Sequence, residues 1–358
     1  MLVIDLLPYI FLLFITLVLP KIIKKNYTLI LGVIYVLFCG FRYGVGWDYF
    51  NYIFTISEGG WYITRMEFVV RQIALFSHSL ENSRIFFIIT SLLITLFFFK
   101  TISKLSLVPR DSIFVYLCLP VFFISSLTTI RFSLAVAFLF YATVYVNRNW
   151  LFYFVFFVLA VLSHKSAVIG IIVVPFISGK ITINRFWNIL IFVLCFGFSH
   201  FYSFSTSVSV ILSYIGRYLD GVSDIAEQGL NYLNNADSSG FSKSPYMYAF
   251  INVFNLVFYN RIIQKDRSEV GQYITLYNLG CCIMFIMSFD QVFASRLAQP
   301  FLIYIMLLAP YYRCLKDLRY FVYFVCVFVF LFQLSVRGSH ADFMYRRNCY
   351  LPYKISIE

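Results

Sequence analysis

Twelve apolar runs follow one another along this chain, and they constrain its fold more than any other feature. A helix that crosses the hydrocarbon core of a bilayer needs about 20 mostly apolar residues. The chain of 358 residues is therefore expected to be an all-α, polytopic integral membrane protein with about 12 transmembrane helices, forming a single transmembrane domain over residues 1–358. The predicted helices lie near residues 2–20, 27–41, 84–99, 112–127, 131–146, 150–163, 166–179, 187–204, 246–260, 271–289, 297–312 and 320–336.

Composition also indicates a membrane protein. Hydrophobic residues make up 61% of the chain and charged residues 12%, whereas a soluble domain carries roughly 25% charged residues. The net charge of +12 is scattered between the apolar runs, so it indicates anionic lipid and anionic substrate rather than nucleic acid. The eight cysteines show no CxxC spacing and are interpreted as small core residues. The first run lacks a preceding basic segment and a cleavage site, so it is predicted to be a retained helix.

Basic residues in the connections predict the orientation. The connections after the first, third, fifth, seventh, ninth and eleventh runs all carry Lys or Arg, and they share one side if every run crosses once. The positive-inside rule makes that side the cytoplasm. The outer side then holds both termini and two long connections, at about 42–83 and 205–245. It also holds Arg42, Arg65, Arg71, Arg84, Arg131, Lys165, Arg217, Lys243, Arg296 and Arg337.

So many basic residues on the outer face run against the usual bias. Charges near a membrane are costly and generally have a partner. An anionic ligand that approaches from outside would supply that partner. The alternative is that each arginine pairs with a carboxylate or reaches a lipid phosphate.

Residues 41–52 are unusually polar and aromatic, with the sequence Phe-Arg-Tyr-Gly-Val-Gly-Trp-Asp-Tyr-Phe-Asn-Tyr. Its two glycines allow a tight turn and a close approach to a ligand. Arg42 can bind a phosphate through two parallel hydrogen bonds, and Asp48 can orient that arginine or act as a base. The aromatic rings can stack on sugars. The alternative interpretation is a helix end with an interfacial aromatic belt and one Arg–Asp pair.

Three other short features fall at predicted outer ends of helices. Arg131 opens one helix, His164 and Lys165 lie between two closely spaced helices, and Arg296 precedes another helix. Helix N-termini favour anions, and these cations would add to that field. His164 can also be a structural hydrogen-bonding residue. A Ser–His pair with Ser163 is disfavoured, because sequence neighbours rarely have that geometry.

The sequence gives no indication of a cofactor or a metal. No HExxH motif, P-loop or dinucleotide fingerprint is present. No acidic pair at metal-ligand spacing occurs on the predicted outer side. A site without metal is therefore expected.

Six blocks of the chain, in order, resemble the EpsG/Wzy family of polysaccharide polymerases. They are Arg42-x3-Gly46-x-Asp48-x3-Tyr52, Glu67 with its following apolar stretch, Arg131-x3-Ala135, His164-x-Ser166-Ala167, Arg296 with Tyr304, and Tyr350-Leu351-Pro352-Tyr353. Together they span nearly the whole chain. One position departs from the family pattern: the residue after the second arginine is often Gln, and here it is Phe132.

The resemblance implies an enzyme that joins oligosaccharide repeat units carried on undecaprenyl diphosphate into O-antigen, capsule or exopolysaccharide. It would act at the outer, periplasmic face of the bacterial inner membrane as a metal-independent, GT-C-like glycosyltransferase. The growing chain would move from its carrier onto a new lipid-linked unit, and undecaprenyl diphosphate would leave. Membrane lipid surrounds the chain, and a chain-length regulator protein is a further partner that the resemblance allows.

Candidate roles follow from this interpretation. Asp48, His164 and Arg131 are the catalytic candidates, and either Asp48 or His164 would accept the proton of the attacking hydroxyl. Arg42, Arg131 and Arg296 would hold diphosphates and stabilise the leaving group. The other candidates for binding diphosphate or sugar are Lys165, Arg217, Trp47 and Tyr52, with further stacking rings at Tyr49 and Trp61.

Three alternatives stay open at the level of sequence. A ligase that moves finished polysaccharide to another lipid would share the basic outer face. A lipid-linked-sugar flippase or solute transporter would need charges along a path through the membrane, and the apolar runs show few. A membrane acyltransferase would use a histidine but would also need a path for its acyl donor.

Overall fold

The computed structural model describes residues 2–201, 244–263, 268–288, 291–336 and 349–355. These residues are helical apart from their connections and one isolated antiparallel bridge between Arg42 and Ile355. The all-α prediction is confirmed. The chain divides into two compact units, which we describe separately: unit 1 comprises residues 1–178 and 305–358, and unit 2 comprises residues 179–304. The single domain over 1–358 stays a prediction.

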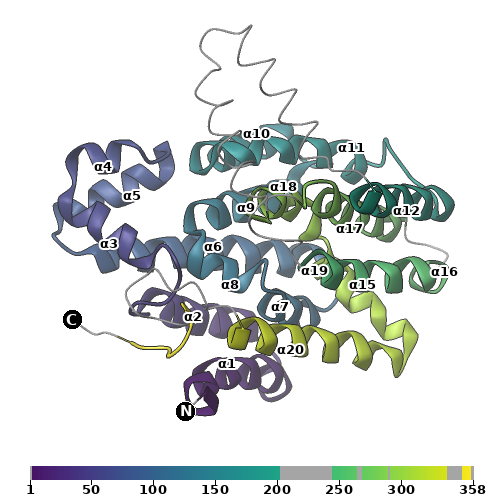
Figure 1. The fold of residues 1–358 in the computed structure, drawn as a ribbon, viewed down its shortest axis with the longest axis horizontal. Helices are drawn as coiled ribbons and strands as arrows, with labels where there is room; N and C mark the ends of the chain where they lie inside the picture. The colour runs from purple at the N-terminus through teal and green to yellow at the C-terminus, as the bar shows by residue number, and fades with distance from the viewer. Residues whose placement is uncertain (1, 202–243, 264–267, 289–290, 337–348, 356–358) are drawn as a thin grey trace, which may run out of the picture. The chain divides into compact units, whose positions relative to one another are not determined.

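Unit 1 holds both ends of the chain (Figure 1). Its elements are α1 (Leu2–Ile22), α2 (Tyr27–Gly40), α3 (Tyr49–Glu58), α4 (Gly60–Thr64), α5 (Phe68–Ser79), α6 (Ser83–Leu105), α7 (Pro109–Cys118), α8 (Phe123–Thr128), α9 (Ile130–Ala142), η1 (Thr143–Tyr145), α10 (Trp150–Ser163), η2 (Lys165–Val173), α11 (Val174–Ile177), α19 (Ile305–Leu308), η3 (Ala309–Leu315) and α20 (Leu318–Val336). Unit 2 comprises α12 (Arg185–Phe201), α15 (Ser244–Val257), α16 (Tyr259–Ile262), α17 (Ser268–Ile286) and α18 (Gln291–Leu302).

The predicted apolar runs coincide with these helices. Among the described residues, four helices are long and apolar enough to cross a membrane: Ile4–Ile22, Ser83–Leu105, Phe293–Leu315 and Leu318–Ser335. Shorter apolar helices match other runs: Tyr27–Gly40, Ile130–Tyr145, Trp150–Ser163, Lys165–Ile177 and Arg185–Ser199. This pattern indicates a multi-pass membrane protein. The total of about twelve crossings stays a prediction.

Some predicted helices are divided in the structure; the run 246–260, for example, covers α15 and α16. The run 112–127 divides into α7 and α8, and Pro120 lies in the connection between them. Proline has no backbone N–H to donate, and it disfavours helical geometry in the residue before it. The apolar character of the run was therefore a poor guide to its length as a helix.

The core of unit 1 forms around α6, which packs against α2, α5 and α9. Aromatic rings fill it: the Phe98 and Tyr116 rings lie 4.9 Å apart, and the Tyr35 and Phe99 rings 5.4 Å apart. By contrast, α1, α10 and α20 expose large apolar side chains, among them Phe11, Leu151 and Phe324. Exposed apolar faces of this extent suit contact with lipid.

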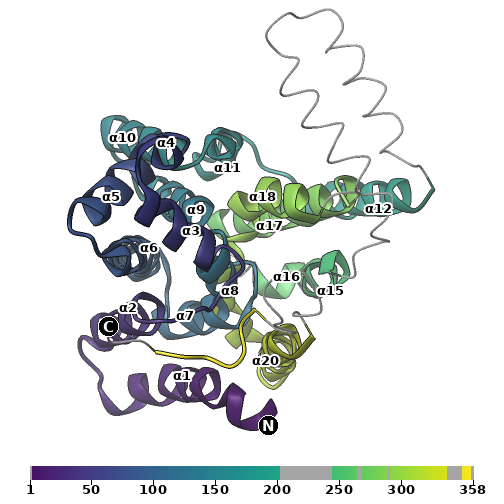
Figure 2. The same ribbon diagram turned by 60° about the vertical axis from the view of Figure 1, so that its left-hand side comes forward.

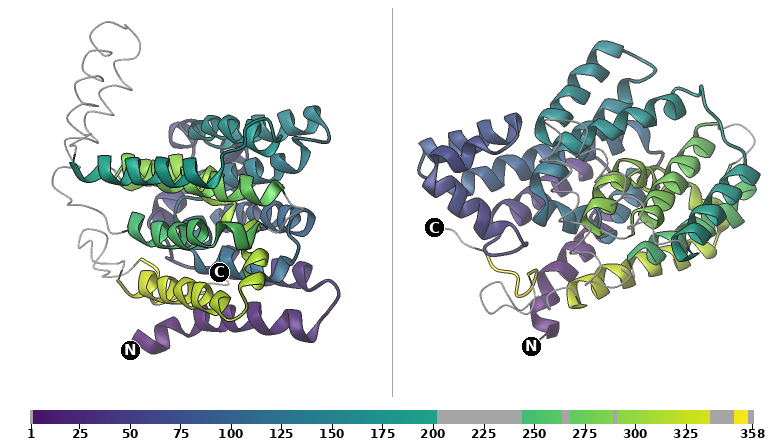
Figure 3. Two further views of the ribbon diagram at one scale, coloured as in Figure 1. Left: turned by 90° about the vertical axis from the view of Figure 1, so that its right-hand side faces the viewer. Right: turned by 45° about the horizontal axis from the view of Figure 1, so that its top comes forward.

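The first and last helices of unit 1 are neighbours. α1 and α20 lie side by side (Figures 1 and 3), and the rings of Tyr9 and Phe330 are 6.3 Å apart. Residues 349–355, which we name the C-terminal segment, cross between α1 and α2 (Figure 2). This path carries the end of the chain back to the connection that follows α2.

A network of buried asparagines joins the helices of unit 2. The Asn278 amide on α17 donates to the Asn188 backbone and side-chain oxygens on α12, at 3.0 and 3.1 Å. Asn252 on α15 donates to the Asn278 side-chain oxygen at 2.6 Å. All three side chains are fully buried. Interhelical hydrogen bonds of this kind fix the register of helices that apolar packing alone leaves free to slide.

The first long connection is itself helical. Its third helix is α5, and α3 and α4 precede it and pack against it. Figure 1 shows the three helices grouped beside the start of α6. The second long connection, at about 205–245, lies outside the described residues up to residue 243.

The orientation leads to a labelling prediction. Ser57 is exposed on α3, and Lys25 is exposed in the connection between α1 and α2. In spheroplasts, an impermeant maleimide is expected to label a Ser57→Cys variant, whereas Lys25→Cys should react only after lysis. The unmodified chain, with its eight cysteines, gives the background. The reverse pattern would place residues 42–83 in the cytoplasm and contradict an outer-face site.

Candidate functional site

The loop between α2 and α3 is shaped by one glycine. Gly46 has a φ of +99°, and a Cβ built there would lie 2.0 Å from the carbonyl oxygen of Leu127. Only glycine permits both this backbone conformation and this close approach. The loop therefore lies directly on the end of α8 and presents Trp47 and Asp48 at the start of α3.

Arg42 is buried beneath this loop, with a side chain 2% exposed. Its Nε donates to the Val45 carbonyl at 3.1 Å, and its Nη2 donates to the Leu127 carbonyl at 3.2 Å. Its Nη1 donates to the Cys39 carbonyl, and the guanidinium carbon lies 5.0 Å from the centre of the Phe87 ring. Burial lowers the pKa of Arg42 from its ordinary value, but an arginine stays protonated in proteins.

These contacts favour a positioning role for Arg42. All three guanidinium nitrogens bond to backbone oxygens, which link the end of α2, the loop and α8. Three of its five N–H groups are therefore engaged with the backbone, which limits bidentate contact with a phosphate. Direct contact between Arg42 and a diphosphate stays a prediction, and the described geometry supports it less than it supports positioning.

The C-terminal segment completes the same loop. The backbone N–H of Tyr43 donates to the Lys354 carbonyl at 2.8 Å, and that of Gly46 donates to the Cys349 carbonyl at 2.8 Å. The Tyr353 ring stacks on Phe38 with centroids 4.1 Å apart, and its hydroxyl donates to the Phe38 carbonyl. The first and last of the six sequence blocks are thus neighbours in space.

Next to the loop, α3, α5 and α9 bring four polar side chains together. Arg131 Nη1 donates to Glu67 Oε2 at 2.8 Å, with the arginine side chain 36% exposed and the glutamate 15% exposed. Burial raises the pKa of Tyr52 to about 12, the charge of Arg131 acts to lower it, and that of Asp48 acts to raise it. Asp48, Tyr52, Glu67 and Arg131 therefore form one electrostatic group, which we name the charged cluster.

The aromatic rings on α3 are already engaged. Tyr49 stacks on Phe87 with centroids 4.7 Å apart, and the Tyr52 ring lies 5.0 Å from that of Phe86. Both tyrosines are buried, which argues against the predicted stacking of their rings on sugar. Trp47 is half-buried, and Trp61 is 61% exposed with Arg65 over its ring at 3.5 Å. Of the four rings, those of the two tryptophans remain candidates for stacking on sugar.

His164 lies beside α9, at the start of η2. The backbone N–H of Ser166 donates to His164 Nδ1 at 3.3 Å, and Ser166 Oγ lies 2.7 Å from the same atom. A backbone N–H can only donate, so Nδ1 is the acceptor, and the neutral ring carries its proton on Nε2. The edge of the Phe132 ring contacts the imidazole, with centroids 5.3 Å apart at 72°.

This tautomer changes the choice between the two proposed bases. In the neutral ring, Nε2–H is a hydrogen-bond donor, suited to a phosphate or sugar oxygen and not to removing a proton. Asp48 is then the better candidate for the base. Phe132, which replaces the family's frequent Gln, is buried and holds the imidazole through ring packing.

The Ser166 contact predicts a graded loss of activity. Ser166→Ala is expected to lower polymer yield severalfold, because one of the two hydrogen bonds that set the tautomer is removed. His164→Ala should lower it further, and His164→Gln should recover part of it, since an amide N–H can replace the Nε2 donor. The measurement is the polysaccharide ladder at equal membrane abundance. Full activity of His164→Ala would remove this residue from the site.

Three predicted site residues remain to be placed. Lys165 is exposed at the first position of η2, one residue after His164. Arg296 lies on α18 in unit 2, where its Nε is buried without a hydrogen-bond partner among the described residues. Arg217 lies outside the described residues. Among the residues that the structure describes, no group of three His, Cys, Asp or Glu side chains is placed to hold a metal ion.

Sequence patterns did not reveal two features of the site. Glu67 was noted only as a family block, and nothing local indicates that it pairs with Arg131, 64 positions later. The second feature is the Leu127 carbonyl oxygen, which accepts a hydrogen bond from Arg42 and lies against Gly46. Because it is a backbone atom, no residue type in the sequence indicates it.

Comparison with known proteins gives one match. The sequence model described as the EpsG family covers residues 25–355. No curated protein and no solved structure matches the chain. The match includes the Arg42 loop, the charged cluster, His164 and the C-terminal segment.

Proposed function

This chain belongs to the EpsG family, and from that premise we propose that it polymerises lipid-linked oligosaccharide repeat units at the outer face of the bacterial inner membrane. Membership links the chain to exopolysaccharide synthesis at the level of the family. The observation that carries the proposal is the charged cluster, in which a base candidate and a partly exposed arginine share one site. About twelve transmembrane helices in a GT-C-like arrangement are part of the proposal.

The reaction is a transfer of a sugar block between two carriers. A hydroxyl oxygen of the incoming lipid-linked unit attacks the anomeric carbon of the growing chain. The bond between that carbon and the diphosphate oxygen breaks, and the electron pair leaves with undecaprenyl diphosphate. The hydroxyl proton passes to the base. The product is longer by one repeat unit and remains attached to the newer carrier.

We assign Asp48 as that base. It lies at the N-terminus of α3, one turn before Tyr52, and its charge acts on the same tyrosine hydroxyl as that of Arg131. Orientation of Arg42 does not need Asp48, because three carbonyl oxygens already hold that guanidinium. An ionised carboxylate within reach of the attacking hydroxyl can accept its proton.

Arg131 is the proposed diphosphate contact. Its Nη1 bonds Glu67 and its guanidinium also interacts with the Tyr52 hydroxyl, but its side chain is 36% exposed, so part of the fork remains accessible. A hydrogen bond between charged groups contributes about 1.5–3 kcal/mol. Such a contact becomes stronger as negative charge develops on the leaving oxygen. It therefore lowers the activation barrier of the transfer and does not only tighten substrate binding.

The remaining residues support these two. His164, with its proton on Nε2, would donate a hydrogen bond to a phosphate or sugar oxygen, and Lys165 would add positive charge beside it. Arg42 positions the loop that carries Trp47 and Asp48. Arg296 and Arg217 remain proposed contacts for diphosphate or sugar, and membrane-facing apolar side chains would hold the polyprenyl tails.

Deletion of the gene distinguishes this function from its rivals. Loss of a polymerase leaves single repeat units transferred to the final acceptor and removes the polymer ladder. Loss of a ligase leaves long polymer on its lipid carrier, and loss of a flippase traps repeat units on the cytoplasmic side. We expect the first pattern, with the ladder restored by the wild-type gene and not by an Asp48→Ala variant. Either of the other patterns would overturn the proposal.

Chelation tests the assignment of charge stabilisation to arginine. If arginines neutralise the leaving diphosphate, polymer formation in isolated membranes supplied with purified lipid-linked repeat units should be unchanged by EDTA. A parallel sample with Mg²⁺ added back serves as the control. Activity lost with EDTA and regained with Mg²⁺ would show that a metal supplies that stabilisation.

A further inference from the structure

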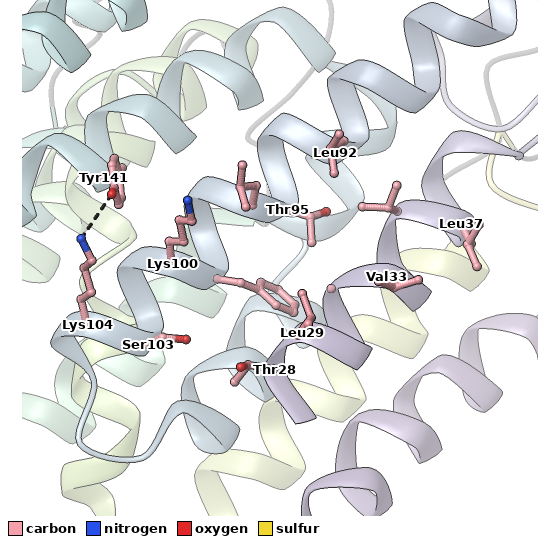
Figure 4. A pocket seen from close by; sticks show the side chains of 14 residues that line it. Thr28, Leu29, Val33, Leu37, Leu92, Thr95, Lys100, Ser103, Lys104 and Tyr141 are labelled. Carbon is pink, nitrogen blue, oxygen red and sulfur yellow. Dashed lines mark hydrogen bonds between the residues drawn. The ribbon is translucent and has the colours of Figure 1, made fainter. Parts of the chain in front are cut away.

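A groove on unit 1 lies apart from the site described above. It runs between α2 and α6 and encloses about 500 Å³ (Figure 4). Over most of its length it is apolar, lined by Leu29, Val33, Val36, Leu37, Leu92 and Leu96. Gly32 forms part of its floor, where a Cβ would lie 3.6 Å from the Phe99 ring.

One end of the groove is cationic. Lys100 and Lys104 lie one helical turn apart on α6, and Thr28 and Ser103 add hydroxyls. Lys104 Nζ donates to the Tyr141 hydroxyl at 3.2 Å (Figure 4) and to the Tyr145 hydroxyl at 3.4 Å. The lining includes no carboxylate. Within the described residues, no hydrogen bond or ion pair engages Lys100.

The dimensions match one leaflet of a bilayer. The twelve steps from Leu92 to Lys104 span ~18 Å at about 1.5 Å per residue. Half of the hydrocarbon core of a bilayer is roughly 15 Å. A lipid chain that starts at the lysines would therefore reach the far end of the groove near the bilayer midplane.

The cationic end is far from the charged cluster. Phe86 and Phe87, whose rings contact Tyr52 and Tyr49, lie near the start of α6, and Lys104 lies in its last turn. The seventeen steps between Phe87 and Lys104 correspond to ~25 Å along the helix. A diphosphate at the lysines could not reach Arg131, so the ligand of this groove is not the reacting substrate.

We propose that the α2–α6 groove binds one anionic phospholipid, with an acyl chain along its apolar wall and the phosphate between Lys100 and Lys104. Basic residues in the connections place this end on the predicted cytoplasmic side, where anionic headgroups lie. The bound lipid fills the space between two helices whose other ends support the Arg42 loop. The two tyrosines hold Lys104 in place for the headgroup, and Lys100 supplies the second cation.

Lipid retention by the purified full-length chain tests this inference. In native mass spectrometry, the chain is expected to retain one phosphatidylglycerol molecule. Added phosphatidylglycerol should displace bound phosphatidylcholine. Lys100→Ala and Lys104→Ala should each weaken retention roughly fivefold, and Lys100→Arg should preserve it. Lys25→Ala, at an exposed lysine outside the groove, is the matched control.

Groove filling gives a second measurement. Gly32→Leu should block the lipid, whereas Gly32→Ala, whose methyl fits the 3.6 Å gap, should not. Equal retention of both phospholipids, or unchanged retention by Lys100→Ala and Lys104→Ala, would show that the groove contacts lipid without selecting it, and the proposal would be wrong. Preferential retention of undecaprenyl phosphate over phosphatidylglycerol would also overturn the assignment. None of these outcomes depends on polymerase activity.

Discussion

Cells whose only copy of the gene encodes Gly46→Ala are expected to make no polymer and to hold little of the protein in their membranes. The new methyl group would lie 2.0 Å from the Leu127 carbonyl oxygen, and a φ of +99° is unfavourable for alanine. Neither backbone segment can move easily to relieve this contact. The Leu127 carbonyl also accepts a hydrogen bond from Arg42, and the Gly46 N–H donates to the Cys349 carbonyl. The combined cost is about 2–5 kcal/mol, a large share of the stability of a typical domain.

Gly60→Ala is the matched control. Gly60 also has a positive φ, +52°, but a Cβ there would meet open space. This variant carries the backbone strain alone, about 1–2 kcal/mol, and should retain most of its abundance and its polymer. An immunoblot of the membrane fraction beside the polysaccharide ladder measures both quantities. Normal abundance and normal chains in Gly46→Ala would show that the loop does not rest on α8 as described.

Replacement of Arg131 should abolish polymer without removing the protein. Its ion pair with Glu67 is partly exposed, and such pairs contribute only about 0–1 kcal/mol to stability. Loss of a group that stabilises developing charge costs about 10²–10³-fold in rate. Arg131→Ala is therefore expected to lower chain synthesis by that factor at unchanged membrane abundance, and Arg131→Lys to impair it strongly, because lysine lacks the planar fork.

A charge exchange separates substrate binding from the ion pair. The double variant Arg131→Glu, Glu67→Arg keeps opposite charges in contact but moves the cation from α9 to the start of α5. If Arg131 contacts diphosphate, this protein should be abundant and inactive. Recovery of long chains in the double variant would mean that Arg131 serves only to pair with Glu67, and the proposed role would be wrong.

The sequence by itself determined the helices of the chain. The predicted run 150–163 has the same bounds as α10, and the run 27–41 differs from α2 by one residue. This agreement has a physical reason: inside lipid, a backbone without water must satisfy its own hydrogen bonds, so a long apolar run forms a helix wherever it lies. One failure, at Pro120, occurred where proline overrides apolar character. The family blocks likewise identified the Arg42 loop, Arg131 and His164 from residue types and their spacing.

Only the tertiary structure decided which contacts those residues make. The Arg42 side chain reaches Leu127, 85 positions later, and the Gly46 N–H reaches Cys349 near the end of the chain. Arg131 pairs with Glu67 across helices, and Ser166 fixes the tautomer of His164. Helix periodicity is a local property, whereas these contacts depend on how distant helices pack and on hydrogen bonds to backbone atoms that every residue possesses. Residue type therefore indicated an arginine-rich site, and packing distinguished a buried arginine that bonds to the loop backbone from one whose side chain is partly exposed.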